Sequence, residues 1–407
     1  MELERENYCL VLGGGGAKGV YHIGVWRALR ELGIQVDAFI GASIGAIIAG
    51  FLAQGSDEAL EEIGRTITVE NILALPEELT RNGEVKLDRD SLAGAREFFS
   101  SLLGKRGLDT DPMRRLLSGR IDEKTIRNSG KDLGVVAVNL SDLVAREVFV
   151  EDMEPGTIID YLMASATFPG FERTEIEGKK YLDGGIYDNV PYAMARKRGY
   201  RHIIVSDISG MGRAKKPQID GTVTIYIKNS IDMGSVLDFN REFLDSFLFL
   251  GYLDTMRTFG RFIGYSYFVE PDSAAEKAFI PHPSVAASEF PDYMRHDRRK
   301  LLLSLECAAS ALGVERIRAY SYESLAAAIE FRKMAVESKI AETEARSGLR
   351  TLAPALREAV TKRRFDECPY YYYRLIGDAF QKTPGSLLRK ALVGFYPELP
   401  AAAAWIG

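Results

Sequence analysis

The chain has 407 residues, of which 46% are hydrophobic and 27% are charged, and its formal net charge is −5. This balance is ordinary for a folded globular protein and argues against a protein that binds nucleic acid through a basic surface. The length allows one large α/β domain and an accessory region.

The three cysteines, Cys9, Cys307 and Cys368, show neither a disulfide pattern nor the spacing of metal ligands, which favours a reducing compartment. The charged residues before Tyr8 contain no apolar signal-peptide region, and no apolar run is long enough to span a bilayer. We therefore expect a cytoplasmic protein that reaches a membrane only peripherally, from its surface.

The first predicted strand, residues 8–12, leads into a glycine-rich loop over 13–19 and then into a predicted helix over 20–32. A glycine loop between a strand and a helix brings free backbone N–H groups together, which suits an anion. A phosphate-binding P-loop is excluded, because Lys18 precedes Gly19 and no Ser or Thr follows.

Two functions compete for this glycine loop. Dinucleotide binding fits the G-x-G-x-x-G spacing of Gly14, Gly16 and Gly19, and Asp37 stands at about the expected distance downstream. The other function is an oxyanion hole, in which backbone donors bind the oxygen of a tetrahedral intermediate. The loop by itself does not separate the two.

The next predicted strand, 34–40, ends at Gly41-Ala42-Ser43-Ile44-Gly45, and an apolar, helix-compatible stretch follows over 46–54. A serine between two glycines at a strand-to-helix junction is typical of a nucleophile elbow, with a tight turn and an incidental serine as the alternative. The helix N-terminus there favours negative charge on the attacking oxygen. An elbow so close to the glycine loop favours the oxyanion function, because a cofactor site has no use for a nucleophile there.

Residues 56–128 are mixed, charged and mostly helical in pattern, and we expect them to serve packing rather than to cap a site. A strand over 133–140 is predicted to form a hairpin with 145–150. A helix over 157–166 follows and stops at Pro169-Gly170.

A short extended segment over 180–182 delivers Asp183 to a turn with Gly184 and Gly185. An aspartate before two glycines is by itself usually a turn residue. The remaining predicted elements of this region are a helix over 190–197 and strands over 202–208 and 222–228.

The rest of the chain reads as helical. A long helix is predicted over 236–263, and its aromatic stripe (Phe239, Phe243, Phe247 and Phe249) favours core over an acyl-chain tunnel. Within the helix-periodic residues 292–347, the basic cluster Arg295, Arg298, Arg299 and Lys300 indicates a solvated face. The amphipathic, basic segment 387–392 favours docking onto the main domain over contact with a membrane surface.

Four motifs therefore stand in one order along the chain: Gly14-Gly15-Gly16-Ala17-Lys18-Gly19, Gly41-Ala42-Ser43-Ile44-Gly45, the segment Ala164–Pro169, and Asp183-Gly184-Gly185. This set resembles the patatin-like phospholipase family, including its bacterial members. The resemblance covers about residues 5–270, which we expect to form the acyl hydrolase domain. Residues 290–407 resemble no family and are expected to form a mainly helical C-terminal region of unknown role.

The resemblance implies an α/β fold with three α/β/α layers and a mostly parallel central sheet. It implies a Ser–Asp dyad, with Ser43 as nucleophile and Asp183 as base, and an oxyanion hole made by the N–H groups of Gly15 and Gly16 together with Gly14 or Ala17. It further implies a phospholipase A or lysophospholipase type of reaction on lipid or lysolipid esters through an acyl-enzyme. A carboxylate is a weak base at neutral pH, with a pKa near ~4, but it can serve when it is held against the hydroxyl in a dry pocket.

Three alternatives remain at this point. A Ser-His-Asp hydrolase needs a late histidine, and His202, His282 and His296 are candidates by chain order alone. A nucleotide-binding module could use the glycine loop, and a decayed, non-catalytic site is the third alternative. No residues have the spacing of a metal site, so we expect neither a metal nor a cofactor.

Overall fold

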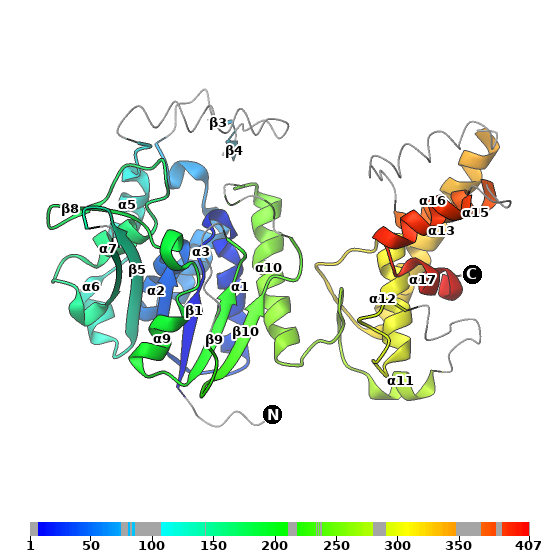
Figure 1. Ribbon diagram of the computed structural model, residues 1–407, viewed down its shortest axis with the longest axis horizontal. Coiled ribbons are helices and arrows are strands. Elements are labelled where there is room, and N and C mark those ends of the chain that lie inside the picture. The colour runs from blue at the N-terminus through cyan, green and yellow to red at the C-terminus, as the bar shows by residue number, and fades with distance from the viewer. Residues whose placement is uncertain are drawn as a thin grey trace. The chain divides into compact units, whose positions relative to one another are not determined.

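The computed structural model describes residues 7–74, 80–81, 84–85, 107–142, 144–210, 218–232, 234, 236, 238–279, 290–346, 368–379 and 385–406. The chain forms two compact units, Met1–Thr258 and Phe259–Gly407 (Figure 1). The first unit thus ends at Thr258, whereas the sequence prediction extended the domain to 270.

Strands and helices alternate along the first unit. Its strands are β1 Tyr8–Leu12, β2 Val36–Ala42, β3 Thr80–Arg81, β4 Glu84–Val85, β5 Asp132–Asn139, β6 Val144–Phe149, β7 Glu175–Ile176, β8 Lys179–Asp183, β9 His202–Asp207 and β10 Val223–Lys228. Its α-helices are α1 Val20–Glu31, α2 Ile44–Gln54, α3 Asp57–Thr66, α5 Asp111–Ser118, α6 Glu123–Asn128, α7 Ile158–Ser165, α8 Gly185–Asp188, α9 Tyr192–Arg198 and α10 Arg241–Thr258. Short 3₁₀ turns occur at Gly16–Gly19, Val69–Asn71 and Val150–Asp152.

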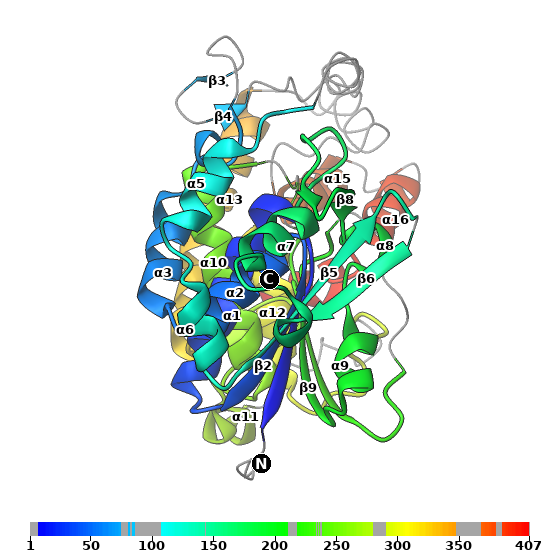
Figure 2. The same ribbon diagram turned by 90° about the vertical axis from the view of Figure 1, so that its left-hand side faces the viewer.

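One sheet organises the first unit, with the strand order β10-β9-β1-β2-β5-β8-β7 and with β6 paired to β5 outside this order. The strands from β10 to β5 are parallel neighbours, whereas β6, β7 and β8 pair antiparallel. Figure 2 shows helices α1, α2, α3 and α10 on one side of this sheet and α9 on the other. The predicted three-layer α/β/α architecture with a mostly parallel sheet is confirmed.

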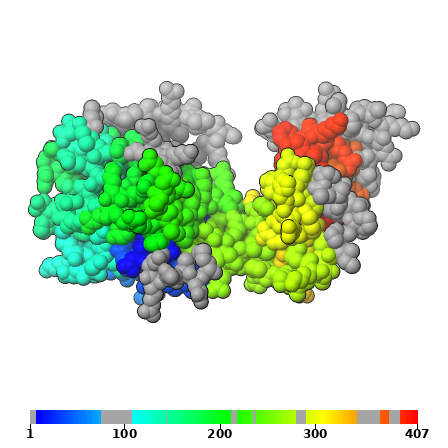
Figure 3. All heavy atoms as spheres, turned by 60° about the horizontal axis from the view of Figure 1, so that its bottom comes forward, coloured from blue at the N-terminus to red at the C-terminus, as the bar shows by residue number. Residues whose placement is uncertain are grey.

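The central strands are apolar on both faces because helices cover both sides of a parallel sheet. Every residue of β1 is buried, and its Cys9 and Val11 belong to the core cluster that includes Tyr192 and Met194 of α9. Figure 3 shows one face of the molecule with all heavy atoms, in which a blue area belongs to residues near the start of the described chain. The glycine loop follows β1 and the Ser43 turn follows β2, so each of them is attached to a strand that is fixed in the core.

The arrangement around β5 brings two distant segments together. Strand β6 occupies one edge of β5, and β2 and β8 share the opposite edge end to end. Strand β2 stops with Ala42 opposite Val136, and β8 stops with Asp183 opposite Ala137. Because β2 runs parallel and β8 antiparallel to β5, their C-terminal ends meet on neighbouring residues of that strand.

The predicted long helix over 236–263 is shorter in the structure. Helix α10 begins at Arg241, because the side chain of Asn240 accepts hydrogen bonds from the amides of Glu242 and Phe243 at the helix start. The aromatic stripe divides accordingly. Phe247 is buried in the core, and Phe249 is exposed.

The second unit is mainly helical. It contains α11 Ser273–Ala278, α12 Lys300–Leu312, α13 Tyr322–Arg346, α15 Pro369–Ala379, α16 Gly385–Phe395 and α17 Leu399–Ile406, with the two-residue strands β11 Phe268–Val269 and β12 Ala319–Tyr320. Helix α12 is buried along most of its length and lies in one core with residues of α13, α15 and α17. None of the helices in the described ranges is both long and apolar enough to cross a membrane.

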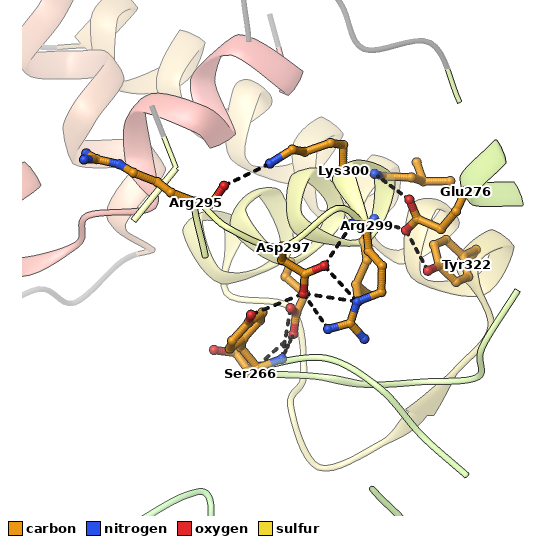
Figure 4. A network of polar contacts seen from close by, with 11 residues as sticks. Ser266, Glu276, Arg295, Asp297, Arg299, Lys300 and Tyr322 are labelled. Atoms are coloured by element: carbon orange, nitrogen blue, oxygen red, sulfur yellow. Dashed lines mark hydrogen bonds and ion pairs between the residues drawn. The ribbon is translucent and has the colours of Figure 1, made fainter. Parts of the chain in front are cut away.

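The basic cluster that the sequence predicted to be a solvated face is only partly open, because Arg295 and Arg298 are exposed whereas Arg299 and Lys300 are half-buried. The Nε of Arg299 donates to Asp297 over 3.0 Å, and the ammonium of Lys300 lies 5.2 Å from the centre of the Phe290 ring. Lys300 also donates to the backbone oxygen of Arg295 at 3.4 Å (Figure 4). Arg299 and Lys300 are thus engaged in contacts within their own unit.

The basic segment 387–392, for which the sequence favoured docking onto the main domain, belongs to the second unit. The segment lies in α16, which packs against α15 of its own unit. Leu392 is fully buried, and the Arg389 guanidinium lies 4.0 Å from the centre of the Tyr373 ring. Among the described side chains of α16, Leu392 is therefore used in the core of the second unit.

Glycines set the close contact between α1 and α10. A Cβ on Gly24 would lie 1.9 Å from the Leu248 carbonyl oxygen, and one on Gly251 would lie 2.1 Å from that of Tyr21. Both obstacles are backbone atoms, which cannot rotate away as a side chain can. The two helices therefore need glycine at these positions to support the sheet from one side.

We expect Gly24→Ala to force α1 and α10 apart and to lower the free energy of unfolding by roughly 1–3 kcal/mol or more. Urea unfolding of the two proteins measures this difference. Gly119→Ala is the control, because a Cβ there would meet only ordinary contacts of 3.4 Å and more at a negative φ. Equal stability of Gly24→Ala and wild type would contradict the close-packing argument.

Candidate active site

Ser43 stands on a strained turn between β2 and α2. Its φ of 55° and ψ of −129° are unusual for a residue with a side chain. The flanking glycines are required by space, because a Cβ on Gly41 would lie 2.2 Å from the Gly45 carbonyl carbon and one on Gly45 would lie 2.3 Å from the Leu12 oxygen. The turn therefore has the shape of a nucleophile elbow and not that of an ordinary loop.

Asp183 faces this serine from the end of β8. The Ser43 hydroxyl donates to Asp183 Oδ2 over 2.6 Å, and the amide of Gly185 donates to Oδ1 over 2.7 Å. Gly184 must lack a side chain, because its Cβ would lie 2.0 Å from the Val136 carbonyl oxygen. The structure thus brings together the serine and the aspartate that the sequence singled out.

The environment of Asp183 makes it a stronger base than an ordinary carboxylate. Burial raises the pKa of Asp183 to about 6, while the hydrogen bonds from Ser43 and Gly185 act in the opposite direction. No cation forms an ion pair with this carboxylate among the residues that the structure describes. It is still ionised at neutral pH, with a pKa closer to the working pH of a general base.

Ser165 fixes the backbone of Ser43. Its hydroxyl accepts the Ser43 amide hydrogen at 2.9 Å and donates to the Val136 carbonyl at 2.6 Å. The neighbouring Thr167 accepts the Asp183 amide hydrogen through its carbonyl at 2.9 Å. Both residues belong to the sequence motif Ala164–Pro169, whose role the sequence alone did not indicate.

The glycine loop offers two amide donors rather than four. The amide of Gly14 donates to the Asn189 carbonyl at 3.0 Å, and that of Ala17 donates to the Val236 carbonyl at 2.8 Å. These two predicted oxyanion donors are therefore already engaged. Within the described part of the chain, the amides of Gly15 and Gly16 have no protein acceptor.

Lys18 and Gly19 complete the loop motif without reaching the cavity through a polar group. Lys18 is buried, and its ammonium lies 3.4 Å from the Ser209 carbonyl oxygen. A Cβ on Gly19 would lie 2.4 Å from the side chain of Ile44, so this glycine lets the loop approach the start of α2. The Lys18 ammonium is thus used inside the fold.

The described histidines do not supply a third catalytic residue. His22 is fully buried, and burial lowers its pKa to about 4, so it is neutral at pH 7. Its Nε2–H donates to the Gly13 carbonyl at 2.8 Å, which leaves Nδ1 to accept from the Ser206 hydroxyl at 2.7 Å. His202 lies beside the Tyr8 ring on β9.

The other two histidines that the sequence proposed are placed differently. His296 belongs to the second unit, and His282 lies outside the described residues. No histidine occurs among the described residues that line the cavity next to Ser43. No described histidine therefore lies where the histidine of a Ser-His-Asp triad would have to be.

An apolar cavity of about 320 Å³ opens at Ser43 and Asp183. Among its described lining residues, only these two and Asn189 carry polar side chains. The apolar walls come from α1, α2, α3, α5 and the loops near them: Val20, Ile23, Ile44, Ile47, Ile48, Phe51, Leu60, Ile63, Ile67, Ile72, Leu73, Met113, Leu116, Leu117, Phe168, Phe171, Val236 and Phe239.

Sequence reasoning missed one wall of this cavity. The stretch 56–128 was expected to serve packing alone, yet Leu60, Ile63, Met113 and Leu117 line the pocket. Phe239, which was assigned to the core, also lines it from the loop before α10. The amphipathic pattern of α3 and α5 predicts a buried apolar face, but it does not tell whether that face meets protein or a ligand.

The dinucleotide alternative conflicts with the topology. Asp37 is the second residue of β2, whereas the glycine loop follows the last residue of β1. Because the two strands are parallel, Asp37 lies at the opposite end of the sheet from the loop. Among the described residues, no group of three or more His, Cys, Asp and Glu side chains could hold a metal ion.

The first unit is thus an α/β protein with a serine nucleophile elbow and a buried aspartate at the mouth of an apolar pocket. The model of the patatin-like phospholipase family matches residues 10–196. Lysophospholipase NTE1 of Cryptococcus neoformans is 30% identical over 203 residues, which are 50% of this chain and 11% of that protein. Patatin-like phospholipase domain-containing protein 6 of Homo sapiens is 28% identical over 208 residues, which are 49% of this chain and 13% of that protein.

The chain therefore spans only a small part of the length of these curated relatives. The crystal structure of VipD from Legionella pneumophila covers 99% of this chain and 88% of that chain, at 15% identity and a TM-score of 0.40, a similarity too weak to carry an argument. The match of the family model, its position over the elbow and Asp183, and the curated relatives agree. Residues 10–196 of this chain are therefore similar to the patatin-like phospholipase family.

Asp183 gives a pH prediction with a definite sign. Its pKa is higher in the folded protein than the ordinary 3.8, so folding binds a proton between about pH 4 and 6, and stability falls as the pH rises through that window. Asp183→Asn lacks this effect. Between pH 4 and pH 7, we expect the free energy of unfolding of Asp183→Asn to rise relative to that of wild type by on the order of 3 kcal/mol. Urea unfolding at both pH values measures the change, and a constant difference would contradict a raised pKa.

Proposed function

We propose that the first unit hydrolyses carboxylic esters of lipids, with Ser43 as nucleophile and Asp183 as the base that activates it. The observation that carries this proposal is the 2.6 Å hydrogen bond between Ser43 Oγ and Asp183 Oδ2 at the polar end of an apolar pocket. A serine needs an adjacent base to be a useful nucleophile, and a single well-placed carboxylate fulfils that role. The names of the relatives, lysophospholipase and patatin-like phospholipase, support a lipid or lysolipid substrate.

In this mechanism Asp183 accepts the Ser43 proton as the serine oxygen attacks the ester carbonyl. The carbonyl oxygen becomes an oxyanion, and the free amides of Gly15 and Gly16 are the donors proposed to stabilise it. The intermediate collapses when protonated Asp183 gives its proton to the departing alcohol, which leaves an acyl ester on Ser43. A water molecule then attacks that ester while Asp183 accepts its proton, and the acid leaves when the proton returns to Ser43.

The apolar pocket supports an acyl chain as the group transferred to Ser43. Ile44, Ile47, Ile48 and Phe51 line the pocket from successive turns of α2. At a rise of 1.5 Å per residue, the distance along the helix from Ser43 to Phe51 is about 12 Å. A chain bound along α2 would exclude water from the dyad, and the low polarity there would strengthen the oxyanion contacts. Cytoplasmic localisation and peripheral membrane contact remain predictions from the sequence.

We expect an alkyl fluorophosphonate to label wild type covalently at Ser43, because the reagent reports an activated serine. Intact-mass and peptide mass spectrometry locate the adduct, and Ser43→Ala should remain unlabelled. Asp183→Asn should fold and label at least 100-fold more slowly, since losing the base of a serine hydrolase costs several orders of magnitude in turnover, roughly 10⁴-fold or more.

The histidine variants separate a dyad from a triad in the same assay. His202→Ala and His296→Ala should be labelled, and should hydrolyse long-chain p-nitrophenyl esters, at rates within about threefold of wild type per folded molecule. Loss of a catalytic base would be far larger, because a fall to one per cent of the wild-type rate already corresponds to about 2.7 kcal/mol of activation free energy. Labelling at another serine, or a folded histidine variant without turnover, would overturn the proposed dyad.

The acyl-pocket assignment predicts a change in chain-length preference. Ile47 lies about one helical turn beyond Ser43, so Ile47→Trp should block a long chain while leaving room for a short one. We expect kcat/KM for palmitoyl esters to fall roughly 10- to 100-fold more than kcat/KM for butyryl esters. The ratio within one variant corrects for any misfolded fraction, and Ile47→Val is the conservative control. An unchanged ratio would place the acyl chain elsewhere.

A further inference from the structure

The two free amides of the glycine loop owe their direction to the carbonyls on the other side of their peptide bonds. In a trans peptide the C=O and the following N–H point in opposite directions, so holding one aims the other. The amide of Gly15 shares its peptide with the carbonyl of Gly14, and the amide of Gly16 shares its peptide with the carbonyl of Gly15. What holds these two carbonyls therefore decides where the oxyanion donors point.

The two carbonyls are held in different ways. The Gly15 carbonyl accepts the Lys18 amide at 3.3 Å, a contact within the loop itself. The Gly14 carbonyl accepts the Nδ2–H of Asn189 at 3.1 Å, a contact from a residue 175 positions away in the chain. Within the described residues, Asn189 supplies the side-chain hydrogen bond that orients a free amide of the loop.

Asn189 holds Gly14 from both sides. Its backbone carbonyl accepts the Gly14 amide at 3.0 Å, while its side-chain amide donates to the Gly14 carbonyl. The contact is close, because a Cβ on Gly14 would lie 2.5 Å from Asn189 Oδ1. Both peptide planes that flank Gly14 are consequently fixed by one residue.

The side chain of Asn189 lowers the stability of the fold in a way that packing alone does not explain. The residue is 3% exposed and lines the cavity beside Ser43 and Asp183. Its Oδ1 is buried and finds no donor among the described residues. A buried carbonyl oxygen without a donor destabilises a fold, so its presence at this site needs a compensating role.

We infer that Asn189 is a positioning residue that aims the Gly15 N–H at the oxyanion. The inference rests on the proposed function, because it assigns a role within the proposed oxyanion hole. Asn189 acts through the Gly14–Gly15 peptide. Without its hydrogen bond, that peptide is free to rotate, and the donor must be reoriented in each reaction. Catalysis by an oxyanion hole depends on donors that are already in place.

The test compares Asn189→Ala and Asn189→Asp with wild type. Alanine removes the donor to Gly14, and aspartate keeps the shape but presents an acceptor to a carbonyl oxygen. For each folded variant we expect kcat for a butyryl ester to fall by about 100-fold or more, the loss typical of one oxyanion donor, with KM within about threefold. Melting curves report the folded fraction.

Binding of an inhibitor gives a readout that a merely structural residue would not move. An alkyl trifluoromethyl ketone adds to Ser43 and forms an oxyanion, whereas the corresponding alkyl methyl ketone binds without forming one. Asn189→Ala should weaken the fluorinated ketone about 100-fold and leave the methyl ketone within about threefold. Asn139→Ala is the matched control, because Asn139 is a fully buried asparagine of the same unit whose amide groups bond Ser141 and Asp142.

The outcomes distinguish this inference from the proposed function. A selective loss for the fluorinated ketone in Asn189→Ala, absent in Asn139→Ala, supports the positioning role even where an ester is a poor substrate. Equal losses for both ketones, or wild-type kcat in a folded Asn189→Ala, would overturn it. A wild type that hydrolyses no lipid ester would instead overturn the proposed function, and the ketone pair would still report on Asn189.

Discussion

The site depends on one topological constraint, the shared edge of β5. Strands β2 and β8 approach each other along that edge from opposite directions and stop at Val136 and Ala137. The residue after β2 is Ser43, and the last residue of β8 is Asp183. The 2.6 Å hydrogen bond between them is therefore fixed by strand register in the core, not by flexible loops. Ser165 reinforces the same junction, because it bonds both Ser43 and Val136.

The chemistry of this junction follows from its burial. A carboxylate next to solvent would be too weak a base for a serine hydroxyl, and a carboxylate paired with a cation would be weaker still. Asp183 is buried without an ion-pair partner among the described residues, so its pKa rises to about 6. The same desolvation destabilises the folded state at neutral pH. Burial of Asp183 thus lowers the stability of the fold at the residue that is proposed to accept the Ser43 proton.

The glycine loop and the pocket surround the Ser43–Asp183 pair. Two of the four loop amides are consumed in holding the loop, and the two that remain face a cavity with almost entirely apolar walls. Under the proposed function, this polar end with Ser43 and the free amides, joined to an apolar wall along α2, would suit an ester with a long acyl chain. The second unit has its own core around α12.

The sequence by itself determined the local parts of the site, because a strand, a glycine turn and a helix follow one another within a few residues. That local order identified Ser43, the glycine loop and the α/β layers. Only the tertiary structure decided the contacts between distant segments: the pairing of Ser43 with Asp183, which are 140 residues apart, and the support of Gly14 by Asn189. It also decided which apolar residues line the pocket, because a side chain that faces a cavity and one that faces the core obey the same hydrophobic pattern.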